Sequence, residues 1–184
     1  MSIAKTVDTE TSGALTIPTV RFGAAEDVSI TSAELFTFPD ALPGLPDSHR
    51  YALVVDDQYE PLRWLQSLDE TPVCLPLLPL EALDEPAYRQ QMVENLRAES
   101  GSDSIVGIDA QPDKVVVLVA RFDDAAGLLA VNLLAPVILD NVTGTGRQVV
   151  LDGPGRSDSE YGQQYPLRIH VSWDAEAKKF RPVC

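Results

Sequence analysis

Basic residues and cysteines are scarce in this chain, and each scarcity argues against a class of protein. The 184 residues include 14 Lys and Arg against 28 Asp and Glu, which gives a formal net charge of -14. A nucleic-acid reader needs a basic surface that displaces the counterions of phosphate groups, so we expect no direct nucleic-acid binding. Two cysteines, Cys74 and Cys184, are too few for a disulfide framework or a structural zinc site. We expect Cys74 to be a small core residue.

The chain also has no long apolar run. Residues 115–120 form the longest uninterrupted aliphatic stretch, and a membrane-spanning helix needs roughly 20 apolar residues. The first 20 residues have no basic segment followed by an apolar one, so they do not resemble a secretory signal. The sequence therefore predicts a cytoplasmic protein that does not enter a membrane.

Groups that could carry catalysis are few. Only His49 and His170 could transfer protons near neutral pH, and neither has a partner at metal-ligand spacing in the sequence. The paired glycines in 144–146 and 153–155 do not complete a phosphate-binding motif. We therefore expect no enzyme, no cofactor and no metal. A metal-assisted hydrolase that uses acidic pairs such as Asp56 and Asp57 is the less favoured alternative.

Short apolar runs separated by turn residues predict a mainly β fold. Residues 51–55 and 62–68 are expected to form an antiparallel hairpin, and residues 137–139 and 148–151 a second hairpin. The β-branched run 115–120 predicts a strand that is buried on both faces.

Two further segments have their own signatures. Pro136 in the apolar run 128–139 indicates an edge strand or a bulge rather than a helix. Residues 86–99 predict the one clear helix, because Pro86 suits a first helical position and apolar residues recur at spacings of three and four. We expect Tyr88 and Met92 on that helix to contact the core.

Composition divides the chain into four parts. Residues 1–18 predict a flexible leader, residues 19–152 the β domain, residues 153–166 a flexible linker and closing segment, and residues 167–184 a C-terminal extension with one possible strand. Charge follows this division, because residues 1–146 carry 8 basic and 23 acidic side chains whereas the remaining 38 carry 6 and 5. The excess of acidic side chains therefore lies within residues 1–146.

Four blocks of sequence resemble the FliW family of flagellar assembly factors in content, order and spacing: residues 38–45, 64–69, 132–139 and 146–151. Residues 21–23 resemble the opening strand of that family and residues 161–166 its closing segment. The resemblance covers roughly residues 20 to 166. It departs at Ala41, where the family has Gly, at Leu45, where it has an aromatic residue, and over residues 82–111, which match poorly.

The resemblance implies a fold and a function. The fold is a single, small, antiparallel β-barrel-like domain with one or two short peripheral helices. The function is that of a flagellar assembly factor that binds two partners, cytoplasmic flagellin and the translational regulator CsrA. Binding to CsrA relieves repression of flagellin mRNA, and flagellin competes for the factor in a partner switch. The alternative is an acidic chaperone for flagellin or another secreted subunit without CsrA regulation. A monomer is expected for the free protein.

Candidate partner contacts come from the matched blocks and the acidic residues around the first predicted hairpin. Trp64 and Gln66 share one face of a strand. We favour core packing for Trp64, and the alternative is that one face of this strand is exposed and Trp64 is an interface anchor. Asn132 is equally compatible with a local hydrogen-bond tie and with a contact role. The full candidate set is Asp56, Asp57, Glu60, Trp64, Gln66, Asp69, Glu70 and Asn132. We expect Phe38, Leu68, Leu134 and Val150 to pack in the core.

Simple solvation is the favoured role of the acidic members of this set, and the alternative is one acidic rim that attracts a basic partner. Reversal of Asp56, Asp57 and Asp69 to Lys is then expected to slow association with CsrA while leaving the fold intact.

Overall fold

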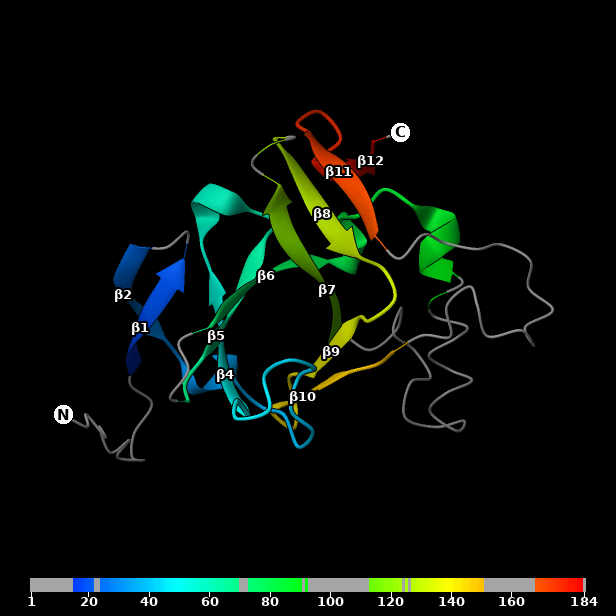
Figure 1. Ribbon diagram of the computed structural model, residues 1–184. Helices are drawn as coiled ribbons and strands as arrows, with labels where there is room; N and C mark the ends of the chain where they lie inside the picture. The colour runs from blue at the N-terminus through cyan, green and yellow to red at the C-terminus, as the bar shows by residue number, and fades with distance from the viewer. Residues whose placement is uncertain are drawn as a thin grey trace, which may run out of the picture.

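The strands of this protein close into a barrel, viewed end-on in Figure 1. The computed structural model describes residues 15–21, 24–69, 73–90, 92, 113–123, 125, 127–150 and 168–183. Seven strands form the barrel: β3 (Leu35–Thr37), β4 (Arg50–Val55), β5 (Arg63–Ser67), β6 (Cys74–Pro79), β7 (Lys114–Asp123), β9 (Val137–Asp140) and β10 (Thr145–Gln148).

Closure of the barrel depends on two contacts between strands distant in sequence. Strand β7 pairs antiparallel with β9, from Lys114 opposite Asp140 to Val117 opposite Val137. Strand β10 pairs with β3 in parallel, through Thr145 and Thr37. The predicted mainly β, barrel-like fold is confirmed. The parallel pairing makes the barrel mixed rather than wholly antiparallel.

Three strands continue the sheet beyond the barrel: β8 (Leu128–Asn132), β11 (Arg168–Asp174) and β12 (Lys179–Pro182). Strand β7 is long enough to pair with β9 along its first part and with β8 along its last part. The strand expected at 167–173 is present as β11. It lies beside β8, so the C-terminal segment is built into the sheet.

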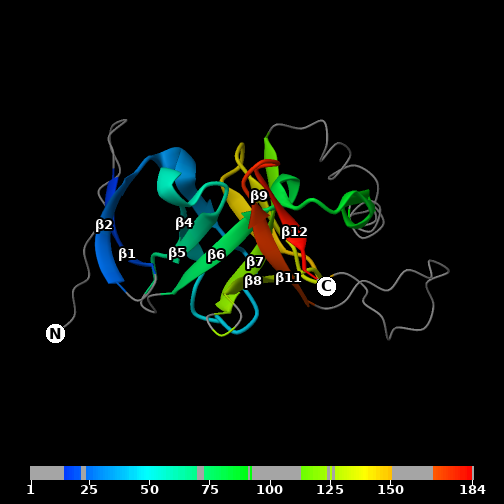
Figure 2. The same cartoon turned by 90° about the horizontal axis from the view of Figure 1, so that it is seen from above.

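Strands β1 (Leu15–Arg21) and β2 (Ala24–Ile30) form a separate two-stranded antiparallel sheet. Figures 1 and 2 place this hairpin at one side of the barrel, next to β4, β5 and β6. Strand β1 begins at Leu15, within the stretch expected to be a leader, and pairs with β2 along its whole length. Residues 1–14 of the predicted leader lie outside the described residues.

Helical structure is limited to short segments in the described residues. Three 3-10 turns occur: η1 (Ser32–Glu34), η2 (Asp57–Tyr59) and η3 (Leu80–Ala82). Residues 86–90 are helical, which confirms the predicted helix start, and most of its remainder to residue 99 lies outside the described residues. The expected core contacts are confirmed, because Tyr88 and Met92 are buried and the Tyr88 hydroxyl donates to the carbonyl oxygen of Leu133 at 2.5 Å.

Apolar side chains gather in two clusters, one on each side of the barrel wall. Successive residues of a strand point to opposite faces, so Leu65 and Leu77 enter the cluster inside the barrel, whereas Trp64 and Leu78 enter the cluster outside it. The outer cluster also takes side chains from the β1–β2 hairpin and from the β8, β11 and β12 strands. A strand such as β5 is therefore covered on both faces.

Several local expectations need correction. The apolar run 128–139 is two strands, β8 and β9, because Pro136 stands between them and cannot donate to a ladder. Val150 is 63% exposed rather than buried, since β10 ends at Gln148 and leaves it beyond the last pairing. Phe38 is buried as expected, and Leu68 and Leu134 are half-buried.

Candidate functional site

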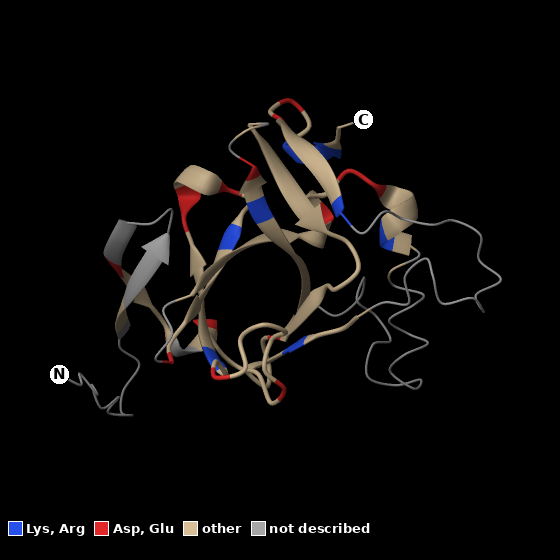
Figure 3. Cartoon of the chain, in the orientation of Figure 1, with Lys and Arg blue, Asp and Glu red and all other residues tan. Residues whose placement is uncertain are grey.

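The turn between β4 and β5 combines acidic and apolar residues at the surface. We call Val55, Asp56, Asp57, Tyr59 and Glu60 the acidic turn. Val55 is 42% exposed and Tyr59 40%, which makes them two of the few large apolar side chains that the described surface presents. Asp57 and Glu60 are exposed beside them. Figure 3 shows acidic segments at this turn and at several other loops of the molecule.

Local hydrogen bonds give the acidic turn a fixed shape. Asp56 caps η2, because its Oδ1 accepts the backbone N–H of Gln58 at 2.9 Å. The N–H groups of Tyr59 and Leu62 donate to the carbonyl oxygens of Asp56 and Tyr59 at 3.0 and 2.9 Å. The Tyr59 ring also packs edge-on against Trp64, with 5.3 Å between ring centroids. The exposed aromatic residue thus rests on a buried one.

Trp64 and Gln66 do not lie at the surface of the described structure. Trp64 is 2% exposed and Gln66 1%, and on the opposite face Leu65 and Ser67 are equally buried. Core packing of Trp64, the favoured interpretation, is confirmed, and the alternative of a strand face open to solvent is wrong, because β5 lies between the barrel interior and the β1–β2 hairpin. Whether either residue contacts a partner stays a prediction.

Asp69 lies at the other end of β5 from the acidic turn. The five residues of that strand span roughly 17 Å at about 3.3 Å per residue. The acidic residues around the hairpin therefore form two separate groups and not one rim. Glu70, also in the candidate set, lies outside the described residues.

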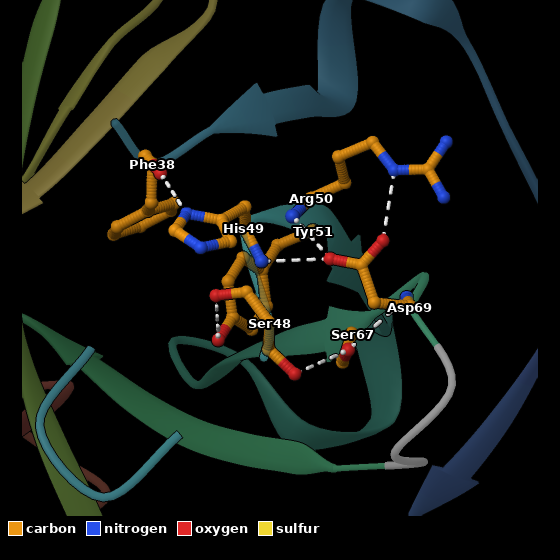
Figure 4. Close-up of polar contacts among 7 residues, drawn as sticks. All are labelled: Phe38, Ser48, His49, Arg50, Tyr51, Ser67 and Asp69. Atoms are coloured by element: carbon orange, nitrogen blue, oxygen red, sulfur yellow. Dashed lines mark hydrogen bonds and ion pairs between the residues drawn. The ribbon is translucent and has the colours of Figure 1, made fainter. Parts of the chain in front are cut away.

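Asp69 is engaged by the backbone of β4 (Figure 4). Its Oδ2 accepts the N–H groups of His49 and Arg50 at 2.7 and 2.9 Å, and its Oδ1 accepts Nε of Arg50 at 2.8 Å. Burial raises the pKa of Asp69, but these hydrogen bonds and the Arg50 charge outweigh it and lower the pKa below its usual value. Asp69 fastens the end of β5 to the start of β4.

Serine, histidine and aspartate meet in this network, but not in the arrangement of a catalytic triad. The Nδ1–H of His49 donates to the carbonyl oxygen of Phe38 at 2.8 Å. The buried Ser48 hydroxyl meets the hydroxyl of Ser67 at 3.2 Å, and Asp69 is occupied by backbone donors. The His49 ring closes the loop 38–49 on itself, whereas Ser48 and the N–H of His49 tie this loop to Ser67 and Asp69 at the end of β5.

The remaining candidate residues have local partners. Oδ1 of Asn132 accepts the N–H of Leu134 at 3.0 Å. This is the local hydrogen bond that was one of the two roles expected for Asn132. His170 is exposed as expected, and its Nε2 lies 3.1 Å from Oδ2 of Asp123. Sequence spacing could not reveal that pair, because it forms across β8 between strands β7 and β11.

Sequence reasoning missed Val55 and Tyr59 as exposed members of the acidic turn. One signal was present, since Tyr59 is an aromatic residue among the polar residues of a predicted turn. Within the described ranges, no three His, Cys, Asp or Glu side chains converge as metal ligands would. No helix in the same ranges is long and apolar enough to cross a membrane.

These features define a class, a small β-barrel protein with an acidic surface and a projecting acidic turn. A sequence profile described as "FliW protein" matches residues 16–167, most of the chain. The chain therefore belongs to the FliW family, a family of non-enzymatic assembly factors. The match agrees with the predicted extent of the resemblance, and it ends one residue before β11.

Curated relatives carry the description "Flagellar assembly factor FliW". The protein of Lachnospira eligens is 28% identical over 148 residues, covering 77% of this chain and 88% of the relative. The protein of Thermotoga maritima is 25% identical over 161 residues, covering 83% and 93%. A solved structure, "Crystal structure of the flagellar assembly factor FliW", aligns with a TM-score of 0.54 at 21% identity and covers 83% of this chain and 96% of that one, which supports the fold.

Proposed function

We propose that this protein is a cytoplasmic flagellar assembly factor that binds CsrA and relieves its repression of flagellin mRNA. Flagellin is the second partner and competes for the factor in a partner switch. Membership of the FliW family over residues 16–167 is the observation that supports this proposal most directly. The net charge of -14 also favours it, because an acidic surface accelerates encounter with a basic RNA-binding protein.

We place the first contact with CsrA at the acidic turn. The exposed carboxylates of this turn would attract a basic partner at long range, and the exposed side chains of Val55 and Tyr59 would be buried against it. Because Tyr59 is supported by the buried Trp64, its ring is ordered before a partner arrives. An ordered side chain loses less conformational entropy on binding.

Direct titration of CsrA from the same cell tests the function. We expect tight binding that weakens between about 50 and about 300 mM salt, since screening shortens the range of charge attraction. Added flagellin should release CsrA. Binding to flagellin without binding to CsrA would instead support a flagellin chaperone with no regulatory role.

Charge reversal of the acidic turn tests the site. We expect D57K/E60K to slow association with CsrA by about tenfold and to flatten its salt dependence, measured by stopped-flow fluorescence. Asp56 and Asp69, which the sequence favoured for reversal, are unsuitable because Asp56 caps η2 and Asp69 holds backbone N–H groups.

A matched variant separates the position of the charge from its total. D40K/D47K makes the same change in net charge at exposed positions of the loop 38–49, near the other end of β4. This control should slow association much less. Equal slowing by both variants would remove the acidic turn as the contact and leave only the net charge of the protein.

A further inference from the structure

The face of β7 that lines the barrel interior continues beyond the barrel. Val117 and Val119 contribute to the cluster inside the barrel, and Arg121 follows on the same face of the strand. Strand β7 pairs with β6 from Val117 to Val119 and with β8 from Ala120 to Asp123. The interior face therefore opens onto solvent at Arg121, which is exposed.

Strands β8 and β11 extend this face. Ala130 of β8 lies opposite Arg121, and His170 of β11 lies opposite Ala130. Residues opposite each other in a ladder share a face. Their neighbours Leu129 and Val171 enter the outer core cluster, so Ala130 and His170 point the other way. Figure 3 shows basic segments on β7 and at the start of β11.

Two further residues complete this surface. Arg168 is exposed and lies two residues before His170 on β11, so both point to the same face. The N–H of Val183 donates to the carbonyl oxygen of His170 at 2.8 Å, and the Val183 side chain is 42% exposed. We call Arg121, Ala130, Arg168, His170 and Val183 the arginine face.

The two arginines of this face have no carboxylate partner in a protein that is rich in carboxylates. The chain has 28 acidic residues against 14 basic ones, and both Arg50 and Arg181 form ion pairs with aspartate. Within the described residues, the guanidinium groups of Arg121 and Arg168 make no hydrogen bond or ion pair. Their charge is therefore available to a partner.

One nearby carboxylate does not neutralise them. Asp123 lies two residues after Arg121 on the same face of β7, but its Oδ2 is 3.1 Å from Nε2 of His170. The face therefore keeps two unpaired guanidinium groups, although the protein as a whole carries a net charge of -14.

Most of the arginine face lies beyond the family match. The FliW profile ends at residue 167, and β11 begins at Arg168. His170 and Val183 also belong to the C-terminal segment that follows the match. Membership of the family therefore does not imply what this face binds.

We propose that the arginine face binds an acidic, extended segment of a partner protein. Guanidinium groups hold carboxylates through paired hydrogen bonds, and exposed Val183 adds an apolar contact at the edge. Nucleic acid fits poorly, because two arginines do not offset the repulsion between phosphates and a net charge of -14. The acidic turn attracts a partner of the opposite sign, so the two surfaces serve different segments.

The positions of the two arginines determine the spacing of the carboxylates. Arg121 and Arg168 lie two strands apart and are offset by two residues along the strands. At about 4.8 Å between strands and about 3.3 Å per residue, their backbone positions are roughly 12 Å apart. An extended chain covers this distance in three or four residues. The segment should therefore carry carboxylates at about that spacing.

Fluorescein-labelled decaglutamate is the probe for this surface, because it offers carboxylates at every spacing. We expect the full chain to bind it at micromolar concentration in about 50 mM salt, measured by fluorescence anisotropy. R121Q/R168Q should weaken binding at least about tenfold, since both charge-assisted contacts are lost. Far-UV circular dichroism checks that the variant is folded.

R147Q/K178Q is the matched control. It removes the same charge at exposed positions on β10 and in the turn between β11 and β12, and it should bind decaglutamate like the wild type. Equal weakening by the two variants, or no binding to the wild type, would overturn the proposal. Decauridylate bound as tightly as decaglutamate would show only a general affinity for anions and would equally overturn it.

Nuclear magnetic resonance of the unmodified protein gives a second test that needs no variant. Decaglutamate should shift the amide resonances of β8, β11 and the end of β7 more than those of β4 and β10. Shifts centred on any other strands would place the binding site elsewhere and contradict the assignment to the arginine face.

Discussion

Gly146 shows how a single residue limits the packing of the barrel. It is buried on β10, and a Cβ atom at this position would overlap the ring of Phe38. Phe38 is fully buried and packs edge-on against Tyr51, with 5.0 Å between ring centroids, so its ring has no room to move aside. The close approach of backbone and ring therefore requires glycine.

We expect Gly146→Ala to lower the free energy of unfolding by about 1 to 3 kcal/mol, the usual cost of overpacking. Urea denaturation followed by circular dichroism measures it. The neighbouring Thr145→Ala, at an exposed position, should change the stability much less. Equal stability of wild type and G146A would mean that the Phe38 ring has another position available.

Asp69 gives a prediction about pH at the same scale. Its pKa is lowered in the folded protein, so its ionised form stabilises the fold above the unfolded pKa of about 3.9. This stabilisation is lost as the pH falls from there through the folded pKa. We expect Asp69→Asn to cost about 2 kcal/mol at neutral pH, as for hydrogen bonds to a charged group.

Denaturant titrations of wild type and D69N across pH check this expectation. The two stability curves should lie apart at pH 7, approach each other as the pH falls below about 4, and meet only below the lowered pKa of Asp69, where both side chains are neutral. A constant separation at all pH values would mean that the charge of Asp69 contributes nothing.

At the scale of elements, hairpins with clear turn signals were predictable and covered strands were not. Strands β4 and β5 pair as expected. A second hairpin is present at β9, but its return strand β10 is Thr145–Gln148 rather than the expected 148–151, because the turn already closes at Gly144, which has a φ of +62°. Strand β6 was not predicted, because it contains Pro76 and Pro79 and proline argues against a strand inside a sheet. The burial of β5 on both faces could not be predicted. The alternation of side chains along a strand shows which residues share a face, but it does not show which other segments pack on that face.

The β11–β12 hairpin is a structural element rather than an appended tail. Val171 and Phe180 enter the outer core cluster, and the N–H of Asp84 donates to the carbonyl oxygen of Phe180 at 2.8 Å. Arg181 bridges Asp84 and Asp174 at 3.0 and 2.8 Å. The hairpin is therefore fastened to the segment that follows η3.

Phe180→Ala should accordingly lower the free energy of unfolding by about 3 kcal/mol, as for other buried phenylalanines. Trp173→Ala is the control on the same hairpin, because the Trp173 ring packs at a tilt against Phe180 but is 43% exposed, so this substitution should cost less. Thermal unfolding of both variants measures the difference. A negligible effect of F180A would mean that β11 and β12 are not part of the cooperative unit.

At the scale of the whole molecule, the net charge of -14 acts against folding. Like charges repel more strongly when the chain is compact, so screening them favours the folded state. We expect the melting temperature to rise by a few degrees between about 10 mM and about 300 mM NaCl, with most of the rise complete once the Debye length is below about 10 Å. A flat melting temperature over this range would show that ion pairs offset the repulsion.

The family and the barrel could be inferred from sequence because four separate blocks match at the right spacing. The site could be inferred only in part. The acidic residues of the first hairpin were found, but Asp69 and the acidic turn are separated by the length of β5, and Trp64 is buried in the outer core cluster. Position along a strand and burial by a distant segment depend on the three-dimensional fold.

The pairing of β3 with β10 also determines when this protein can fold during synthesis. Thr37 and Thr145 are 108 positions apart, so the barrel stays open until residue 145 has left the ribosome. Contacts between such distant segments make folding slow compared with helical proteins of similar size. Until then the meander of β3 to β6 has unpaired edges, and a nascent chain at this stage is the form most exposed to aggregation and to capture by chaperones.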